Sequence, residues 1–233
     1  MKSFKNKASI LVVAASLTFF VSTIQTHAQN SDMQKKAEFG IRFMPAFTSL
    51  TLKTAEGGTV SGDVTLGFGL GVLLGFNFSN HIGVQTEVIY NSLSQKSKDA
   101  QSDRKITLKY VNVPLLFSVN TGKSKVINLN LVAGPQIGFN LGSSLTVSGV
   151  TDINNPQPVL SVKKGDLGFA YGAGVDFGLN AARTVRLGLG YRGVFGLLDI
   201  SNKSNTVITN SYYVLDRTKL RTHAVYAGLS ILF

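Results

Sequence analysis

The sequence predicts an all-β fold, an eight-stranded antiparallel up-and-down transmembrane β-barrel, preceded by a cleavable signal peptide. Three observations favour this fold class. Apolar residues alternate with small or polar residues through long segments, most clearly in residues 64–78 (VTLGFGLGVLLGFNF). Charged residues form only 15% of the chain, whereas about 25% is usual in soluble domains. Beyond the N-terminus the sequence holds no run of about 18 apolar residues that would make a spanning helix, so strands are the expected crossing elements.

Residues 64–78 are the clearest predicted strand. Every even-numbered residue here is large and apolar, while the odd-numbered residues are mostly glycine, threonine and asparagine. A period of two belongs to a β-strand whose two faces meet different environments. The segment is also far longer than a usual strand of about five or six residues. We interpret it as a barrel strand with its apolar face toward lipid and its small-residue face toward the lumen.

The N-terminal residues have the features of a secretory signal peptide. Three lysines precede the apolar stretch 8–24, and Thr26-His27-Ala28 offers a small-residue cleavage site. A retained anchor is the alternative, but serine and threonine interrupt the apolar core. We therefore expect a signal peptide (residues 1–28), a flexible periplasmic lead-in (residues 29–37) and a β-barrel domain (residues 38–233).

The same alternation recurs in seven further segments. The eight expected strands are residues 38–52, 64–78, 82–93, 106–120, 126–142, 166–179, 184–198 and 220–233. The long connections between them are residues 53–63, 94–105, 143–165 and 199–219. Long connections alternate with short ones, as in an antiparallel membrane barrel with short periplasmic turns and long external loops. An even number of strands places both termini on the periplasmic side.

Three prolines count against uninterrupted strand pairing. Pro45, Pro114 and Pro135 lie inside predicted strands, where proline cannot donate a ladder hydrogen bond. We expect bulges or local breaks at these positions.

A soluble eight-stranded barrel of the lipocalin type is the main structural alternative. Such a barrel turns a face of lysine, glutamate, aspartate and threonine to water. The less apolar face here is instead glycine, asparagine, threonine and alanine with few charges, which suits an enclosed lumen. A lipocalin-type Gly-x-Trp near the first strand is impossible, because the sequence has no tryptophan.

Charge and reactive residues exclude several function classes. The formal net charge of +11 falls to +8 when the three signal-peptide lysines leave. The excess is scattered, with clusters mainly in predicted loops, so we expect contact with anionic lipid headgroups or plain solvation, and no nucleic-acid partner. The absence of cysteine excludes disulfides and thiol nucleophiles. His81 and His223 lack metal-ligand spacing, so we expect no catalytic residue, cofactor or metal.

Several segments resemble one known family. They are residues 110–117 (YVNVPLLF), 131–139 (LVAGPQIGF), 166–177 (DLGFAYGAGVDF), 191–198 (YRGVFGLL) and the C-terminal AGLSILF. Together they look like the PorT-type outer-membrane β-barrel domain family over residues 38–233. The resemblance implies a barrel in the outer membrane of a Gram-negative bacterium and, from some relatives, an accessory role in secretion or gliding machinery. It implies no catalytic residues.

The last strand ends in a pattern common among outer-membrane barrels. Phe233 follows Ile231 and Leu229 at alternating positions. We expect these three residues to form the assembly signal, with the barrel assembly machinery as a partner.

Five charged residues have the parity of lumen-facing positions: Arg42, Glu87, Asp176, Arg186 and Arg192. An eight-stranded barrel is only wide enough to be filled by its own side chains, and buried charges need partners. We predict that these residues form an ionic network that plugs the lumen. A hairpin in which Leu179 faces Arg183 would put Asp176 directly opposite Arg186. A proton or ion path through these residues is the alternative.

Together these features predict an integral outer membrane β-barrel protein with a plugged lumen, non-enzymatic and structural or accessory in role. Its expected partners are outer membrane lipid and periplasmic or secretion-system proteins. Two other functions stay open. One is a narrow channel or small-solute transporter, and the other is an adhesin that acts through residues 143–165 and 199–219.

Overall fold

The computed structural model describes most of the predicted barrel domain. The described residues are 35–49, 51–53, 59–61, 63–98, 102–149, 157–202, 211–215 and 218–233. The predicted signal peptide, residues 1–28, lies outside them, as does most of the predicted lead-in. Within the described ranges, no helix is long and apolar enough to cross a membrane.

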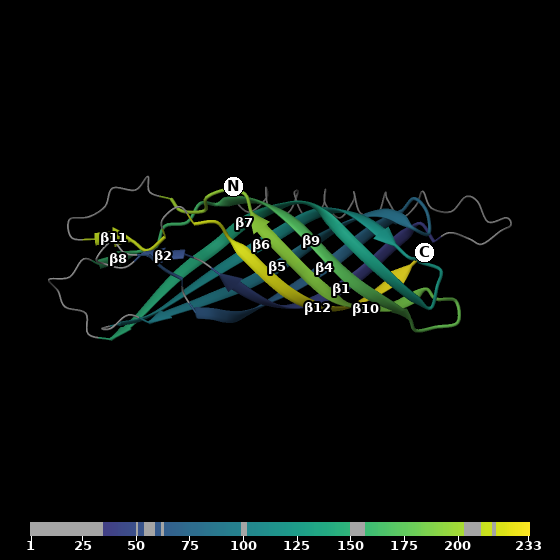
Figure 1. The fold of residues 1–233 in the computed structure, drawn as a ribbon, viewed down its shortest axis with the longest axis horizontal. Coiled ribbons are helices and arrows are strands. Elements are labelled where there is room, and N and C mark those ends of the chain that lie inside the picture. Colours follow the sequence, from purple (N-terminus) through teal and green to yellow (C-terminus); the bar gives the residue numbers. More distant parts are fainter. Residues whose placement is uncertain are drawn as a thin grey trace, which may run out of the picture. The chain divides into compact units, whose positions relative to one another are not determined.

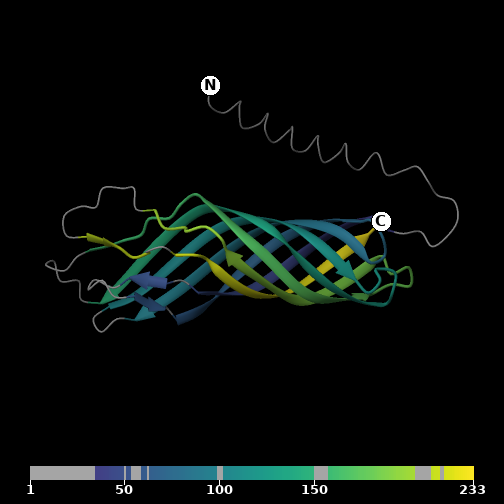
Figure 2. The same ribbon diagram turned by 45° about the horizontal axis from the view of Figure 1, so that its top comes forward.

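Eight long strands form one closed barrel. They are β1 (Ala37–Ser49), β4 (Asp63–Asn77), β5 (Ile82–Lys98), β6 (Ser102–Asn120), β7 (Ile127–Gly149), β9 (Gly165–Gly178), β10 (Val185–Gly196) and β12 (Arg221–Leu232). Every neighbouring pair is antiparallel, and β1 pairs with β12 to close the sheet. Figure 1 and Figure 2 show these strands tilted around a common axis. The predicted eight-stranded antiparallel barrel is confirmed.

The two ends of the barrel differ, as the alternating connection lengths predicted. Three short turns, residues 78–81, 121–126 and 179–184, lie at one end, which we call the turn end. The first and last barrel residues meet there, where the Phe233 amide donates to the Ala37 carbonyl oxygen at 2.8 Å. The other end, the loop end, carries the longer connections (Figure 1). Two small sheets occur in these connections, β2 (Thr51–Lys53) with β3 (Thr59–Ser61) and β8 (Gln157–Val159) with β11 (Ser211–Tyr213).

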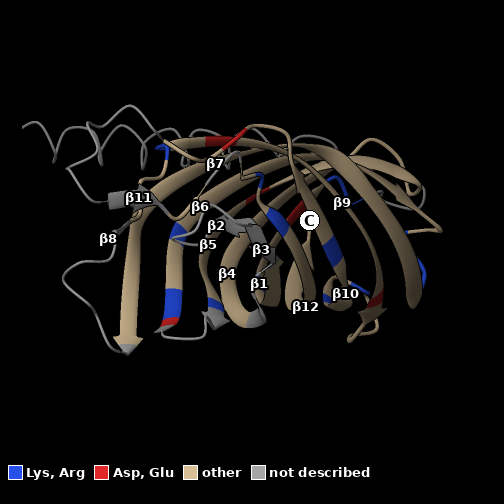
Figure 3. Ribbon diagram, turned by 60° about the vertical axis from the view of Figure 1, so that its left-hand side comes forward, with Lys and Arg blue, Asp and Glu red and all other residues tan. Residues whose placement is uncertain are grey.

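The outward face of the barrel carries an apolar belt. All eight long strands expose large apolar side chains there, such as Leu115 on β6, which is 57% exposed. On β5 and β6 the belt runs from the turn end up to the outward pair of Tyr90 and Val111, and the next outward pair is Ser92 and Lys109. In Figure 3 the strands are mostly tan, with few charged segments along them. Such a belt matches a lipid environment.

The strands continue past the belt into the predicted loops, so those loop boundaries are wrong in part. Within predicted loop 94–105, β5 and β6 stay paired, with Lys96 opposite Lys105. Strand β7 runs to Gly149, inside predicted loop 143–165. Strands β3 and β11 lie within the other two predicted loops.

A reversal of the alternation explains this error. Beyond the belt, the inward residues Leu93, Ile106 and Leu108 are apolar and buried. The outward residues Ser94 and Thr107 are polar, and their hydroxyl oxygens lie 3.3 Å apart. An antiparallel sheet outside lipid can have one packed face and one solvated face, so a polar composition here is compatible with a strand.

The three prolines interrupt strand pairing, as predicted. The pairing of β1 with β12 skips from Phe43 to Ala46, around Pro45. The pairing of β5 with β6 skips a segment that includes Pro114, and that of β6 with β7 skips a segment that includes Pro135. The register is the same on both sides of each gap, so these are local breaks and not bulges.

Candidate functional site

At the centre of the lumen, one carboxylate lies between two guanidinium groups. The Glu87 side chain on β5 is only 1% exposed, and its Oε1 lies 2.5 Å from Arg42 Nη1 and 3.0 Å from Arg192 Nη2. Gln85 Nε2 donates to the same oxygen at 3.2 Å. The Arg42 guanidinium lies over the Tyr226 ring, 4.4 Å from its centre. This cation–π contact partly offsets the second positive charge. We call these five residues the central cluster.

Glycines on the barrel wall make room for the central cluster. A Cβ atom at Gly190 would lie 2.6 Å from the Tyr226 ring, and one at Gly174 would overlap the Tyr226 hydroxyl. A Cβ at Gly228 would lie 2.8 Å from Arg42 Cγ. Real Cβ atoms essentially never approach within 3.0 Å. The small-residue face of these strands is therefore required by the packing of the lumen.

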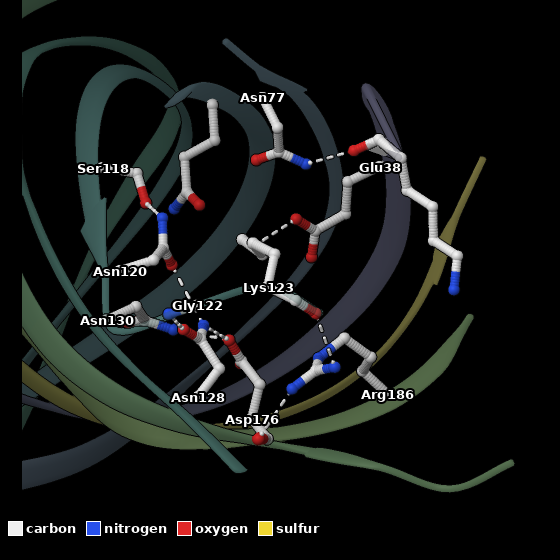
Figure 4. Close-up of polar contacts among 12 residues, drawn as sticks. Glu38, Asn77, Ser118, Asn120, Gly122, Lys123, Asn128, Asn130, Asp176 and Arg186 are labelled. Carbon is white, nitrogen blue, oxygen red and sulfur yellow. Dashed lines mark hydrogen bonds and ion pairs between the residues drawn. The ribbon is translucent and has the colours of Figure 1, made fainter. Parts of the chain in front are cut away.

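A second polar group, nearer the turn end, surrounds Asp176 on β9. Asp176 Oδ2 accepts hydrogen bonds from Asn128 Nδ2 and Asn130 Nδ2, both at 2.9 Å. Asn128 Nδ2 also donates to Asn120 Oδ1 at 3.0 Å, and Asn120 Nδ2 donates to Ser118 Oγ at 3.0 Å. All five side chains are buried (Figure 4). We call them the asparagine group, in which amide donors satisfy a buried carboxylate.

The turn between β6 and β7 folds into the turn end of the lumen. Lys123 in this turn is 7% exposed, and its Nζ lies 2.5 Å from Glu38 Oε2 on β1. Arg186 Nη1 on β10 donates to the Lys123 carbonyl oxygen at 3.0 Å. Gly122, whose φ of 146° favours glycine, donates to Asn128 Oδ1 at 3.0 Å. Figure 4 shows Lys123 aimed at Glu38, with Arg186 beside the turn. The inserted turn thus joins three parts of the barrel wall.

The predicted pairing of Asp176 with Arg186 is wrong. Asp176 faces Gly188, and Arg186 faces Gly178. The two residues still meet, but through the Asp176 backbone carbonyl, which accepts a hydrogen bond from Arg186 Nη2 at 3.0 Å. The cause is the turn 179–184, which is longer than the predicted one and shifts the register by two residues.

The loop end of the lumen is filled by apolar side chains. Inward residues of β1, β5, β6 and β12 pack there with Ile200, Val214 and Leu215. These three residues come from predicted polar loop 199–219, and each is at most 1% exposed. The prediction that this connection is a polar loop is therefore wrong in part, because these three residues fold inward. We call this packing the apolar cap.

A small space remains between the central cluster and the inserted turn. Its volume is about 10 Å³, and its lining includes Glu38, Arg42, Asp176 and Ser230. A volume of this size holds about one water molecule. The described part of the lumen is thus filled at three levels: the inserted turn, the central cluster and the apolar cap.

The structure brings together three of the five predicted lumen residues. Arg42, Glu87 and Arg192 meet in the central cluster. Asp176 and Arg186 lie nearer the turn end and make mainly neutral hydrogen-bond contacts, the first with amides and the second with carbonyl oxygens.

Three contributors to the site were missed at the sequence level. Glu38 shares the parity of Arg42, and Tyr226 has the inward parity of the last strand, so the alternation held the signal for both. Lys123 lies in a turn, where no alternation exists to place its side chain.

The remaining predicted residues lie on the outside of the barrel. Phe233, Ile231 and Leu229 are exposed at the end of the chain, and their role in assembly stays a prediction. The His223 ring stacks on Tyr191, whose hydroxyl lies 2.5 Å from His223 Nδ1. Among the residues that the structure describes, no group of three His, Asp or Glu side chains is placed to hold a metal ion.

These features define the class of protein. A closed antiparallel barrel with an apolar outer belt, a filled lumen and alternating short and long connections is the architecture of outer-membrane barrels. The chain is therefore an outer membrane β-barrel protein. Residues 27–202 match the family model described as the outer membrane protein beta-barrel domain, and the chain belongs to that family. In such barrels the short turns are periplasmic and the longer loops are external.

Solved outer-membrane barrels have a similar fold. OprG from Pseudomonas aeruginosa is 15% identical, with a TM-score of 0.51 over 86% of this chain and 97% of OprG. Neisserial surface protein A is 15% identical, with a TM-score of 0.45 over 84% of this chain and 97% of its own. Ail of Yersinia pestis is 18% identical, with a TM-score of 0.40 over 84% of this chain and 99% of its own. No curated protein matches this chain in sequence. At these identities the likeness concerns the fold alone.

Proposed function

We propose that this protein is a non-enzymatic, non-conducting accessory component of the outer membrane of a Gram-negative bacterium, of the PorT type. The observation that carries the proposal is the filling of the lumen at three levels. Charged and apolar side chains of the chain itself occupy the lumen, whereas a channel would need a continuous polar path through it. Its function then lies at its two ends, where periplasmic or secretion-system proteins can bind.

The cost of opening the lumen supports this proposal. The inserted turn is held by the ion pair of Lys123 with Glu38 and by hydrogen bonds from Arg186. Breaking a buried ion pair costs about 3–5 kcal/mol when a charge is left without its partner. Withdrawal of the turn would break this pair, so the closed state is strongly favoured.

Conductance in planar bilayers tests the non-conducting part of the proposal. We expect no sustained current from the unaltered protein. The double variant K123A/R186A removes the two cations that hold the inserted turn, and we expect it to stay closed as well, because the central cluster and the apolar cap still fill the lumen. Ser124 is exposed in the same turn, so S124A is the matched control and should behave as the unaltered protein. A sustained, ion-selective current from the unaltered protein would favour the narrow channel instead.

Site-specific photo-crosslinking in cells tests the accessory role. A crosslinker at Ser124 or Ala182 samples the periplasmic turns, where both residues are exposed, and one at Ser144 samples the exposed external part of β7. Recurrent adducts with defined periplasmic or inner-membrane proteins from the first two positions, and not from Ser144, support the accessory role. The accessory role would be contradicted if the periplasmic positions gave no more adducts than the same positions in an unrelated barrel.

One observation favours the adhesin as a second candidate. Strands β5, β6 and β7 extend beyond the apolar belt and carry polar outward residues at the external end. A partner on another cell could bind there. Crosslinks that form only from Ser144, together with loss of cell binding when the extension is shortened, would move the assignment to an adhesin.

A further inference from the structure

Directly above the apolar belt, the outward face of β5, β6 and β7 becomes cationic and rich in hydroxyl groups. Moving away from the belt along β6, the outward residues are Lys109, Thr107 and Lys105. Their partners on β5 are, in the same order, Ser92, Ser94 and Lys96. On β7, Thr146 lies opposite Lys105. The hydroxyl–lysine face consists of Ser92, Ser94, Lys105, Thr107, Lys109 and Thr146.

This face carries positive charge that the described part of the chain does not neutralise. Lys105 and Lys109 are exposed, and neither forms an ion pair with another described residue. Asp103, the nearest outward acid on β6, lies one row beyond Lys105. Between the two lysines, the Ser94 and Thr107 hydroxyl groups can both donate and accept hydrogen bonds. Ammonium and hydroxyl groups in this arrangement suit an anionic ligand with many oxygen atoms.

The height of the face above the belt indicates where such a ligand comes from. Lys109 lies one outward row beyond the Tyr90–Val111 pair that ends the belt, which is about 7 Å along the strand. This is the headgroup level of the external leaflet. A lysine stem can cover apolar surface there while its ammonium group stays among polar groups.

The spacing of the two lysines indicates the kind of headgroup. Lys105 is four residues from Lys109 on β6, or about 14 Å along the strand. One phosphate cannot contact both ammonium groups at that separation. A headgroup that reaches both must carry separated phosphates on an extended body, and the intervening Ser94 and Thr107 hydroxyls suit a sugar.

We propose that the hydroxyl–lysine face binds the phosphorylated sugar headgroup of a lipid in the external leaflet. Lys105 and Lys109 each contact a phosphate, and the hydroxyl groups between them contact the sugar. The bound headgroup fixes the external ends of β5 and β6 at the membrane surface. This inference concerns the lipid-facing wall and does not depend on the proposed accessory role.

Native mass spectrometry of the purified barrel with added lipid tests the proposal. The probes are bisphosphorylated lipid A, its monophosphorylated form and phosphatidylethanolamine. We expect the unaltered protein to retain the bisphosphorylated form best and phosphatidylethanolamine least. The variant K105Q/K109Q should bind bisphosphorylated lipid A about 30-fold more weakly, because each basic side chain near a membrane surface contributes about a factor of five.

The matched control removes two cations from the opposite side of the barrel. Lys219 and Arg221 are exposed at the external end, and β12 is four strands from β6 in either direction around the sheet. The variant K219Q/R221Q should keep the affinity within about twofold. The variant S94A/T107A changes no charge. It should weaken the retention of lipid A and reduce the preference for lipid A over phosphatidylethanolamine. Circular dichroism confirms that each variant is folded.

Three results would overturn the proposal. The first is equal retention of the two phosphorylated forms by the unaltered protein. The second is unchanged binding by folded K105Q/K109Q. The third is a loss of lipid A binding in K219Q/R221Q equal to that in K105Q/K109Q. Such a result would show that the net charge of the protein, and not the hydroxyl–lysine face, attracts the lipid.

Discussion

Removal of the charge on Glu87 should destabilise the barrel strongly. Glu87→Gln keeps the size of the side chain but leaves Arg42 and Arg192 facing a neutral amide. The Glu87 and Arg192 side chains are 1% and 2% exposed, so bulk water cannot replace the lost charge. Removing one partner of a buried ion pair costs about 3–5 kcal/mol. Because Arg42 keeps its contact with Tyr226, we expect the free energy of unfolding to fall by an amount within that range.

Urea titration in lipid vesicles or detergent micelles measures this change. The sequence has no tryptophan, so far-UV circular dichroism and electrophoretic mobility with and without heating report the folded fraction. The slope of stability against urea should stay constant, since the variant exposes the same surface on unfolding. Asp103 is an exposed acid, and Asp103→Asn is the matched control with an expected change within about 0.5 kcal/mol.

A triple variant separates the loss of charge balance from the loss of packing. The variant R42M/E87M/R192M replaces all three charges of the central cluster with apolar side chains, which is often neutral or stabilising for buried ionic groups. We expect it to recover most of the stability lost in Glu87→Gln. A loss below about 1 kcal/mol in Glu87→Gln would refute the reasoning, because it would mean that lumenal water solvates the two guanidinium groups.

Three further predictions concern other contacts in the lumen; two use the same titration and one uses the yield of folded barrel. Asp176→Asn should cost about 1–3 kcal/mol, because an amide cannot accept from two amide donors as well as a carboxylate does; an unchanged midpoint would contradict the asparagine group. Gly190→Val should greatly lower the yield of folded barrel by colliding with Tyr226, whereas Gly142→Ala should change nothing, since a Cβ there meets no atom within 4 Å; equal yields would contradict the packing argument. Lys123→Met should cost about 3–5 kcal/mol by leaving a buried carboxylate without its cation, and unaltered stability would show that the inserted turn is held by its backbone contacts alone.

The alternation of side chains was enough to predict which residues face the lumen. Side-chain direction in a strand alternates whatever the partner strand is, so Arg42, Glu87 and Arg192 were placed inside without knowledge of their neighbours. Register depends instead on turn geometry. Arg183 has a φ of 54°, a left-handed conformation that is uncommon for arginine. The longer turn built around it shifted Asp176 away from the predicted partner.

The external extension was missed for a different reason. In the membrane the outward face of a strand must be apolar, and only alternation in that sense predicts a membrane-spanning strand. Above the belt, Leu93 and Ile106 point inward and are buried, while Ser94 and Lys105 point outward. The alternation continues above the belt, but the apolar residues now point inward and the polar residues point outward. The segment therefore has the polar composition of a loop although it is a strand. Ile200 lies in an irregular segment, where no period could have indicated its inward position.

The central cluster has a consequence for the time course of folding. Its ion pairs join residues that lie 45 and 105 positions apart in the chain, on β1, β5 and β10. Strands β1 and β5 both flank β4, so Arg42 and Glu87 can meet as soon as these three strands curl. Strand β10 is four strands from β5 in either direction, so the ion pair of Arg192 with Glu87 forms only when the barrel closes. Interactions absent from the folding transition state slow unfolding and leave the folding rate almost unchanged. The ion pair of Arg192 with Glu87 should therefore act mainly by extending the lifetime of the assembled barrel.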